Sequence, residues 1–325
     1  MISATKNGIY AKIEASGSFL PTTVVTNDQL AKVVDTSDEW ITERTGIKCR
    51  HLAGPKDTTL SMAVAAAKDC LAHTDRPSEE VLASIDLVLV ATCTADYLFP
   101  SVACGVQQAL GLNAREVPSL DLSAACAGFV YALDVAEQYI LSKRARSVLV
   151  IGVDRMSSIV DWSDRSTCIL FADGAAAVLL SASKDPGILG TCLHSDGVHS
   201  DMLYATRENG GKIKMRGNAT FKLAVTKLSE VVEELLSATK LTRDQVDWLV
   251  PHQANIRIIE ATAKRLNLSE DRVIQTVKQH GNTSAASVPL ALDYGIRNGL
   301  IKRGELLLLD AFGGGMTWGA SLIKY

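Results

Sequence analysis

The sequence lacks three features that would assign it quickly to a class of protein. It has no apolar run long enough to cross a bilayer. Its 33 basic and 36 acidic residues leave a formal net charge of −3, which does not point to nucleic acid or an anionic membrane as partner. Residues 1–13 lack the apolar core of a signal peptide, so we expect a cytoplasmic protein.

The cysteines also lack any recognisable pairing pattern. Their number is odd, and no CxxC pair or Cys/His spacing typical of a metal site is present. They lie mostly within apolar runs, at positions 49, 70, 93, 104, 126, 168 and 192. We therefore expect reduced thiols and no bound metal.

Apolar strand-like runs alternate with helix-like segments along the chain. Examples are IDLVLVAT at residues 85–92 and RSVLVIGV at residues 146–153. The alternation predicts α/β layers with mainly parallel sheet. A length of 325 residues suits one large domain or two ordinary ones. Because the pattern starts again in the later part, we expect two similar halves, residues 1–180 and 181–325.

Two segments carry more specific expectations. ILFADGAAAVLL at residues 169–180 is expected to be a strand broken at Asp173 and Gly174. Residues 200–215, rich in glycine, lysine and arginine, are expected to form a surface loop.

Residues 119–142 carry the most informative pattern. A short apolar strand leads through a turn of small residues into a helix that is apolar on most sides. Cys126 lies at that turn, where the helix dipole and unpaired amide groups favour the reactive thiolate. A buried, inert cysteine is the alternative, so this segment alone leaves the role of Cys126 open.

Three further segments carry groups that could act with this thiol. His252 follows an apolar strand, and a neutral imidazole there can accept a proton or donate a hydrogen bond. Asn282 could cap the following helix or point an amide donor at a developing oxyanion. The glycines of residues 312–319 suit an oxyanion hole rather than a dinucleotide site.

Together these motifs resemble those of the β-ketoacyl-acyl-carrier-protein synthase III family, which starts bacterial type II fatty acid synthesis. The four motifs are SAACAGF, PHQAN, HGNTSAASVP and AFGGGMTWG, in that order. TSDEWITERTGI at residues 36–47 and DRSTCILFADGAAA at residues 164–177 extend the resemblance over nearly the whole chain. It implies a thiolase-like fold, with two βα halves in αβαβα layers, and a homodimer.

The resemblance also implies roles for individual residues. Cys126, His252 and Asn282 would form the catalytic triad, and the N–H groups of Cys126 and Gly314 the oxyanion hole. Coenzyme A would contact Trp40, Arg44, Arg165, Asn218, Phe221 and Asn255. The acyl pocket would include Leu170, together with Phe99 from the partner subunit. The acidic acyl carrier protein would dock on Arg257, Lys264 and Arg265. The region between residues 194 and 215 looks shortened against the family pattern.

The implied reaction has two steps and needs no cofactor, because the coenzyme A thioester is itself a substrate. An acyl group, expected to be acetyl, passes from acyl-coenzyme A to Cys126. Decarboxylative condensation with malonyl-acyl carrier protein then gives the 3-oxoacyl-acyl carrier protein and carbon dioxide.

Other functions share parts of this pattern. A relative that condenses a branched, medium-chain or aromatic starter would have the same triad. A non-catalytic, acyl-carrier-binding partner subunit would not need an intact triad. A degradative thiolase would need a cysteine after Cys192, an elongating synthase a histidine in place of Asn282, and a peroxide sensor a resolving cysteine. The starter acyl group stays open.

Overall fold

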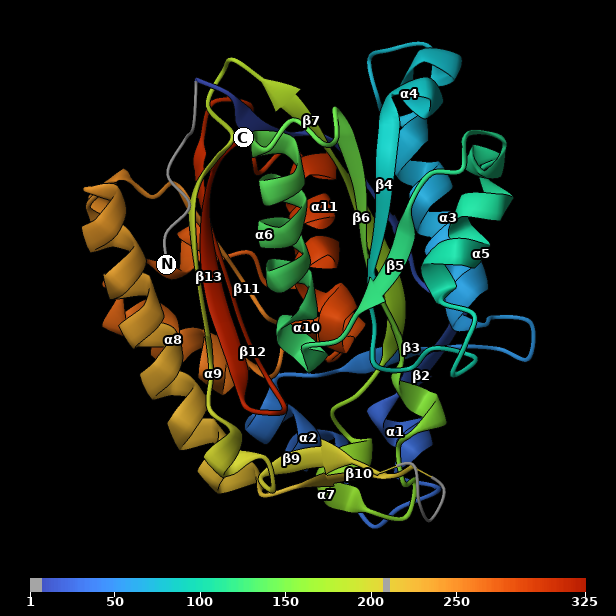
Figure 1. Ribbon diagram of the computed structural model, residues 1–325. Helices are drawn as coiled ribbons and strands as arrows, with labels where there is room; N and C mark the ends of the chain where they lie inside the picture. Colours follow the sequence, from blue (N-terminus) through green and yellow to red (C-terminus); the bar gives the residue numbers. More distant parts are fainter. Residues whose placement is uncertain (1–7, 207–210) are drawn as a thin grey trace.

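The computed structural model describes residues 8–206 and 211–325, which form five alternating layers of helix and sheet (Figure 1). The first sheet has the order β1 (Tyr10–Phe19), β7 (Asp173–Ser183), β6 (Ser147–Arg155), β4 (Ile85–Ala91) and β5 (Ser119–Leu122). The second has the order β11 (Trp248–Pro251), β12 (Leu306–Gly313), β13 (Thr317–Lys324) and β8 (Ile188–Ser195).

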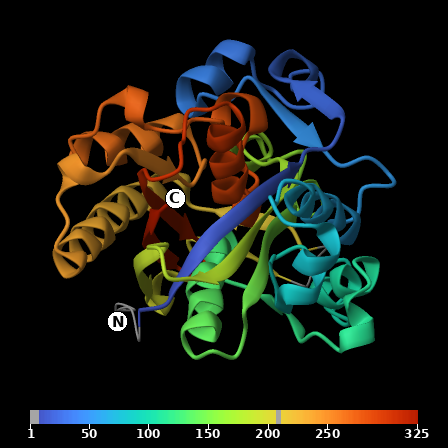
Figure 2. The same cartoon turned by 90° about the horizontal axis from the view of Figure 1, so that it is seen from above.

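Helices α6 (Gly128–Leu141) and α11 (Ser287–Arg297) form the central layer, in contact with both sheets. The outer face of the first sheet is covered by α3 (Thr59–Ala72), α4 (Ser78–Ser84) and α5 (Val102–Ala109). The outer layer on the second sheet is formed by α8 (Gly217–Thr239) and, packed against it, α9 (Ile256–Arg265). Figure 2 shows the same order from above, with green α6 and red α11 between the flanking helices. Because α6 packs against sheets on both sides, its sequence is apolar nearly all round.

The two sheets repeat one pairing pattern. In the first, β4 and β6 are parallel, while β7 is antiparallel to both β6 and β1. In the second, β11 and β12 are parallel, while β13 is antiparallel to both β12 and β8. In the first sheet, β5 pairs in parallel with β4. The corresponding feature in the second sheet is a single parallel bridge between Leu249 of β11 and Val273. We propose that the two halves meet between β7 and β8; the expected boundary at residue 180 lies inside β7.

The expectation of mainly parallel sheet is wrong, because both sheets are mixed. The three-residue turn between β12 and β13 can join only antiparallel neighbours. The broken strand expected over residues 169–180 is also wrong. β7 begins at Asp173 and runs without a break, and Phe171 before it forms only an isolated bridge with Asn282.

Shorter elements lie at the edge of the sheets where the candidate site is found. They are β2 (Thr23–Thr26), α1 (Asn27–Leu30), α2 (Asp38–Thr45), β3 (Cys49–Leu52), α7 (Arg165–Cys168) and α10 (Val277–His280). The segment expected to be a surface loop instead contains the hairpin β9 (Leu203–Ala205) and β10 (Ile213–Met215). Residues 207–210 of that segment and residues 1–7 at the start of the chain lie outside the described residues.

No helix within residues 8–206 and 211–325 is long and apolar enough to cross a membrane. All seven cysteines are free.

Candidate active site

Cys126 lies on the short helix η2 (Ala125–Ala127), between the carboxyl end of β5 and the start of α6. Ala125 adopts a left-handed conformation with φ 46°, which turns the chain sharply before the cysteine. The cysteine is only 6 % exposed. It therefore occupies the strand-to-helix turn expected from the sequence.

A second short helix, η7 (Ser284–Ala286), directly precedes α11 and packs against η2 from the other half. Its position is held by the first half of the chain. The N–H of Asn282 donates to the carbonyl of Leu170 at 2.9 Å, and the N–H of Ala285 donates to the carboxylate of Asp154 at 3.0 Å. A Cβ atom built at Gly152 of β6 would collide with the carbonyl oxygen of Ala285. Glycine at this position lets η7 approach the first sheet.

The side chain of Asn282 has a fixed orientation. Its Oδ1 accepts the N–H of Ser284 at 2.9 Å, which assigns the NH₂ group to the opposite side of the amide. The expected alternative, a helix cap, is wrong: α11 is preceded by Ala286 and has no side-chain cap. Asn282 is 6 % exposed, and its NH₂ group has no acceptor within the described part of the chain. An amide donor is thus available to a ligand.

His252 follows β11 directly, and its N–H donates to the carbonyl of Asp310 at 2.8 Å. Its ring nitrogen Nδ1 lies 2.9 Å from the hydroxyl of Ser287. The ring is 5 % exposed, and burial lowers the pKa of His252 to about 4. The imidazole is therefore neutral at physiological pH, with Nε2 free of protein partners among the described residues.

The expectation of a thiolate-favouring environment at Cys126 is wrong. Burial raises the pKa of the Cys126 thiol to about 11, although a hydrogen bond from Ser284 opposes the shift. The nearby carboxylate of Asp154 raises the pKa further. Withdrawal from water is the largest cause of the raised pKa of this thiol. The free protein therefore carries a protonated thiol at neutral pH.

The glycine turn after β12 lies against the cysteine. A Cβ atom built at Gly313 would lie 2.7 Å from the backbone nitrogen of Cys126, so only glycine fits there. The hydroxyl of Thr317 donates to the carbonyl of Ala124 at 2.8 Å and fixes the turn on the segment before Cys126. Gly314 follows directly and faces β9, where Leu203 lies. The oxyanion hole at Cys126 and Gly314 stays a prediction.

Three of the expected coenzyme A residues form one cluster. The guanidinium carbons of Arg44 and Arg165 lie 4.3 and 4.7 Å from the centre of the Trp40 ring. Arg165 also donates to the carbonyl of Asp35 at 3.0 Å. The Trp40 ring is thus covered by guanidinium groups, and its contact with coenzyme A stays a prediction.

The remaining expected coenzyme A residues lie at the starts of α8 and α9. Asn218 is exposed, and Phe221 lies 5.3 Å from the guanidinium carbon of Arg257. Asn255 caps α9 by accepting the N–H of Ile258. Gly46, at the end of α2, packs against Ile256, which brings the Trp40 cluster close to α9. The expected docking residues Arg257, Lys264 and Arg265 are all exposed on α9.

The two expected acyl-pocket residues are not brought together within one chain. Leu170 is buried beside Asn282, whereas Phe99 is 84 % exposed. Phe99 lines a surface pocket of about 680 Å³ next to Ser123 and Cys93. An exposed phenylalanine is in keeping with the expectation that it reaches a partner subunit.

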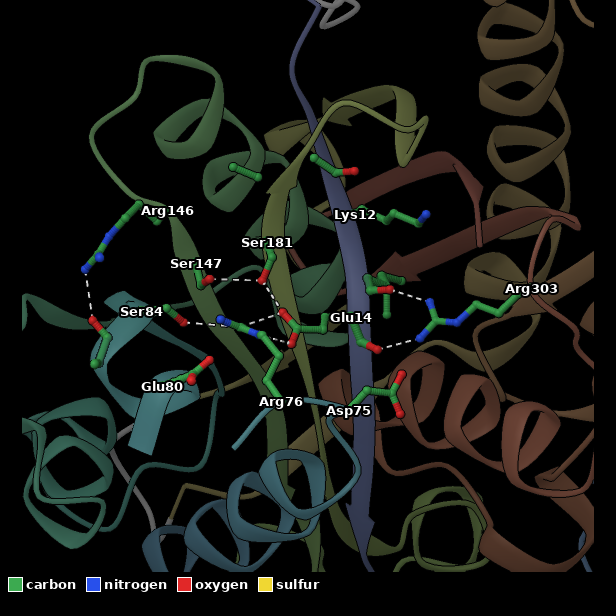
Figure 3. A pocket seen from close by; sticks show the side chains of 14 residues that line it. Lys12, Glu14, Asp75, Arg76, Glu80, Ser84, Arg146, Ser147, Ser181 and Arg303 are labelled. Atoms are coloured by element: carbon green, nitrogen blue, oxygen red, sulfur yellow. Dashed lines mark hydrogen bonds and ion pairs between the residues drawn. The ribbon is translucent and has the colours of Figure 1, made fainter. Parts of the chain in front are cut away.

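Another pocket, of about 940 Å³, lies far from this site (Figure 3). Glu14 at its centre binds Arg76 through two hydrogen bonds of 2.6 and 2.7 Å and accepts the hydroxyl of Ser181. Ser147 marks the amino end of β6, whereas Asp154 lies near its carboxyl end. The charged groups at its centre bind one another, whereas Asp75 and Glu80 at the edge of the pocket are exposed.

Three polar residues near Cys126 and His252 were not predicted from the sequence. Asp154 accepts hydrogen bonds from Thr92, Cys93, Thr94 and Ala285. The hydroxyl of Ser284 contacts both Cys126 and Cys93, the latter at 3.9 Å. Ser287 contacts His252. Asp154 could have been found, because it lies near the carboxyl end of a buried strand, where α/β sheets place their sites.

Comparisons with known proteins agree with one another. Two family profiles match, "3-Oxoacyl-[acyl-carrier-protein (ACP)] synthase III" over residues 120–197 and its C-terminal counterpart over residues 236–325. A β-ketoacyl-[acyl-carrier-protein] synthase III of Coxiella burnetii is 53 % identical over 97 % of this chain and 99 % of its own.

Solved structures show the same likeness. The 3-oxoacyl-[acyl-carrier-protein] synthase III of Aquifex aeolicus superimposes with a TM-score of 0.92 at 46 % identity, over 97 % of this chain and 100 % of its own. The priming β-ketosynthase of the R1128 polyketide biosynthetic pathway superimposes with a TM-score of 0.91 at 34 % identity, over 98 % of this chain and 97 % of its own.

We predict that His280 makes the folded chain less stable as the pH falls from about 6.5 to about 4. Burial, helped by nearby His51, lowers the pKa of His280 to about 4, whereas an unfolded histidine titrates near 6.5. Between these values only the unfolded chain binds the proton, which costs on the order of 3 kcal/mol of stability.

The measurement is urea unfolding of the wild type and His280→Gln at pH 7.5 and pH 4.5. The variant should lose less stability on acidification. This difference separates His280 from Asp310, whose pKa burial raises to about 7 and which acts in the opposite direction. Equal pH dependence in both proteins would contradict the prediction.

Proposed function

The chain belongs to the β-ketoacyl-acyl-carrier-protein synthase III family of thiolase-like condensing enzymes, and we propose that it uses Cys126, His252 and Asn282 to condense an acetyl starter. As a member of this family it is an acyltransferase of the initiating condensation, from acyl-coenzyme A and malonyl-acyl carrier protein, in fatty acid synthesis. The observation that carries the assignment of residues is the packing of η2 against η7, which joins a buried thiol to an oriented amide.

In the first step the sulfur of Cys126 attacks the thioester carbonyl of acetyl-coenzyme A. The bond between the carbonyl carbon and the coenzyme A sulfur breaks, and the thiol proton ends on that sulfur. Backbone N–H groups of Cys126 and Gly314 stabilise the tetrahedral oxyanion. Because the thiol of Cys126 is protonated in the free protein, the activation barrier of acyl transfer includes the ionisation of this thiol.

In the second step malonyl-acyl carrier protein loses carbon dioxide, and negative charge develops on its thioester oxygen. The NH₂ group of Asn282 and the ring of His252 are the neutral donors for that oxygen. The resulting carbanion attacks the acetyl carbonyl on Cys126. The cysteine leaves as a thiolate, takes up a proton, and 3-oxobutanoyl-acyl carrier protein departs.

A different starter acyl group is the second candidate, and one observation favours it. A priming β-ketosynthase of a polyketide pathway shares the fold at 34 % identity. A branched, medium-chain or aromatic starter uses the same triad, so the choice depends on the pocket near Leu170 and Phe99. A non-catalytic partner subunit is disfavoured by the three candidate catalytic groups. The cytoplasmic location stays a prediction from the sequence.

We predict that acetyl-coenzyme A adds one acetyl group to the wild type and none to Cys126→Ser, measured by intact-protein mass spectrometry. Asn282→Ala should still accept the acetyl group but should lose condensation with malonyl-acyl carrier protein by about a hundredfold or more, since one oxyanion donor is gone. Loss of both half-reactions to the same degree would count against the role of Asn282.

The donor series also separates the candidate functions. Labelling only by a longer or branched acyl-coenzyme A would keep the mechanism and change the starter. If no acyl-coenzyme A gives an adduct, the non-catalytic partner subunit would be the remaining candidate function.

The acyl carrier protein is proposed to dock on the exposed basic face of α9, formed by Arg257, Lys264 and Arg265. We predict that the double variant Lys264→Glu/Arg265→Glu raises the KM for malonyl-acyl carrier protein at least tenfold, because an acidic partner meets like charge. Acetyl loading from acetyl-coenzyme A should stay near the wild-type rate.

Lys68→Glu on α3, in the opposite outer layer, is the matched control and should not change that KM. An unchanged KM in the double variant would place docking elsewhere.

The homodimer is proposed to form through β5 and the loop before α5. β5 is an edge strand of the first sheet, and its residue Leu120 is exposed. Three further exposed apolar residues, Tyr97, Leu98 and Phe99, lie in the loop before α5. We predict that Phe99→Asp shifts the protein from dimer to monomer in light scattering. The control Leu300→Asp, also at an exposed apolar residue, should remain dimeric. A monomeric wild type would overturn this arrangement.

A further inference from the structure

We propose that Ser287 is a positioning residue that holds His252 in the tautomer with its proton on Nε2. His252 then acts as a hydrogen-bond donor in the proposed reaction and does not accept the proton of Cys126. Ser287 lies at the start of α11, and His252 follows β11. The Oγ of Ser287 lies 2.9 Å from the Nδ1 of His252. The catalytic consequence of this tautomer rests on the proposed function, whereas the tautomer itself does not.

The hydroxyl of Ser287 has two hydrogen-bond partners among the described residues. A serine hydroxyl has one hydrogen to donate and two lone pairs that accept. The backbone N–H of Gln253 donates to this oxygen at 2.6 Å, and that nitrogen can only be a donor. The other partner is Nδ1 of His252, which can take either role.

Only one assignment satisfies every group. Within residues 8–206 and 211–325, Nδ1 of His252 is the sole acceptor in reach of the Ser287 hydrogen. If Nδ1 carried the ring proton, it would also have to donate to the hydroxyl. The serine hydrogen would then be a buried donor without an acceptor, at a residue that is 1 % exposed. The hydroxyl therefore donates to Nδ1, and Nδ1 is unprotonated.

The state of the ring follows from its burial. A doubly protonated imidazole is disfavoured because its pKa is lowered to about 4. A neutral ring carries one proton, which the hydroxyl of Ser287 directs to Nε2. This nitrogen lies on the opposite side of the ring from Ser287 and is free of partners among the described residues.

The same segment orients the second donor. Ser284 fixes Asn282 through its backbone N–H, and Ser287 fixes His252 through its side chain, so residues 282–287 aim both donors. A neutral Nε2–H has no lone pair in the ring plane to accept a proton. The proton of Cys126 therefore ends on the coenzyme A sulfur as the thioester bond breaks, with no charge left on His252.

The test is ¹⁵N NMR of histidine-labelled protein near pH 7, with the His252 signals assigned by their loss in His252→Asn. The wild type should show a protonated Nε2 and an unprotonated Nδ1. Ser287→Ala should move His252 at least partly to the other tautomer, and Ser287→Thr, which keeps the hydroxyl, should restore the wild-type pattern. Ser147→Ala removes a buried hydroxyl that bonds Ser181 far from the site, and it should change nothing.

Kinetics on the same variants test the consequence. Ser287→Ala should lower condensation about tenfold or more, with acetyl loading of Cys126 within about twofold of the wild type, because only the enolate step uses the Nε2 donor. Ser287→Thr should recover most of the activity.

The proposal fails if wild-type His252 carries its proton on Nδ1, a measurement that does not depend on whether any variant folds. It also fails if Ser287→Ala keeps the Nε2 proton. A wild type that accepts no acyl group would overturn the proposed function alone, because the NMR result stands apart from it.

Discussion

The contact between η2 and η7 is the constraint on which the rest of the structure depends. Two turns that lead into the central helices, one from each half, meet between the sheets where only small residues fit. A Cβ atom at Gly152 would lie 2.4 Å from the carbonyl oxygen of Ala285, and one at Gly313 would lie 2.7 Å from the backbone nitrogen of Cys126. Ala125 and Ser284 both take left-handed conformations to make the turns. Such strain persists only where surrounding packing fixes it, and here it sets the cysteine beside its polar partners.

Burial at this contact keeps the thiol of Cys126 and the ring of His252 uncharged in the free protein. The thiol of Cys126 is protonated because its pKa is raised to about 11, and the ring of His252 is neutral because its pKa is lowered to about 4. A site without fixed charge at these two groups stabilises charge only when the reaction creates it. Oriented neutral donors suit this purpose, since they are already in place and surrounded by little water. The same burial that makes ionisation of the thiol costly therefore strengthens the hydrogen bonds that follow.

The sequence predicted more of the site than of the sheet pairing, for physical reasons. The turn of small residues at Cys126 and the place of His252 after a strand depend on local sequence patterns, and both are as expected. β7 is covered by helices on both faces, so its apolar run reads like a parallel strand although its pairing is antiparallel. The contact of Ser287 with His252 joins residues 35 positions apart, and only the fold brings them together. Local patterns thus located the reactive groups, but not the groups that orient them.

The way the two halves share the site limits where specificity can reside. Cys126 belongs to the first half and its donors to the second, yet Asn282 and Ala285 are held by Leu170 and Asp154 of the first half. Any shift of one half against the other would therefore disturb the nucleophile and the donors together. The chemistry requires this interface to be rigid. We therefore expect differences in starter group or carrier to come from the side chain of Leu170 and from elements outside the interface, namely the Trp40 cluster, the β9–β10 hairpin and the exposed loop at Phe99. These elements surround the site without carrying the residues that react, so they can change without loss of the condensation itself.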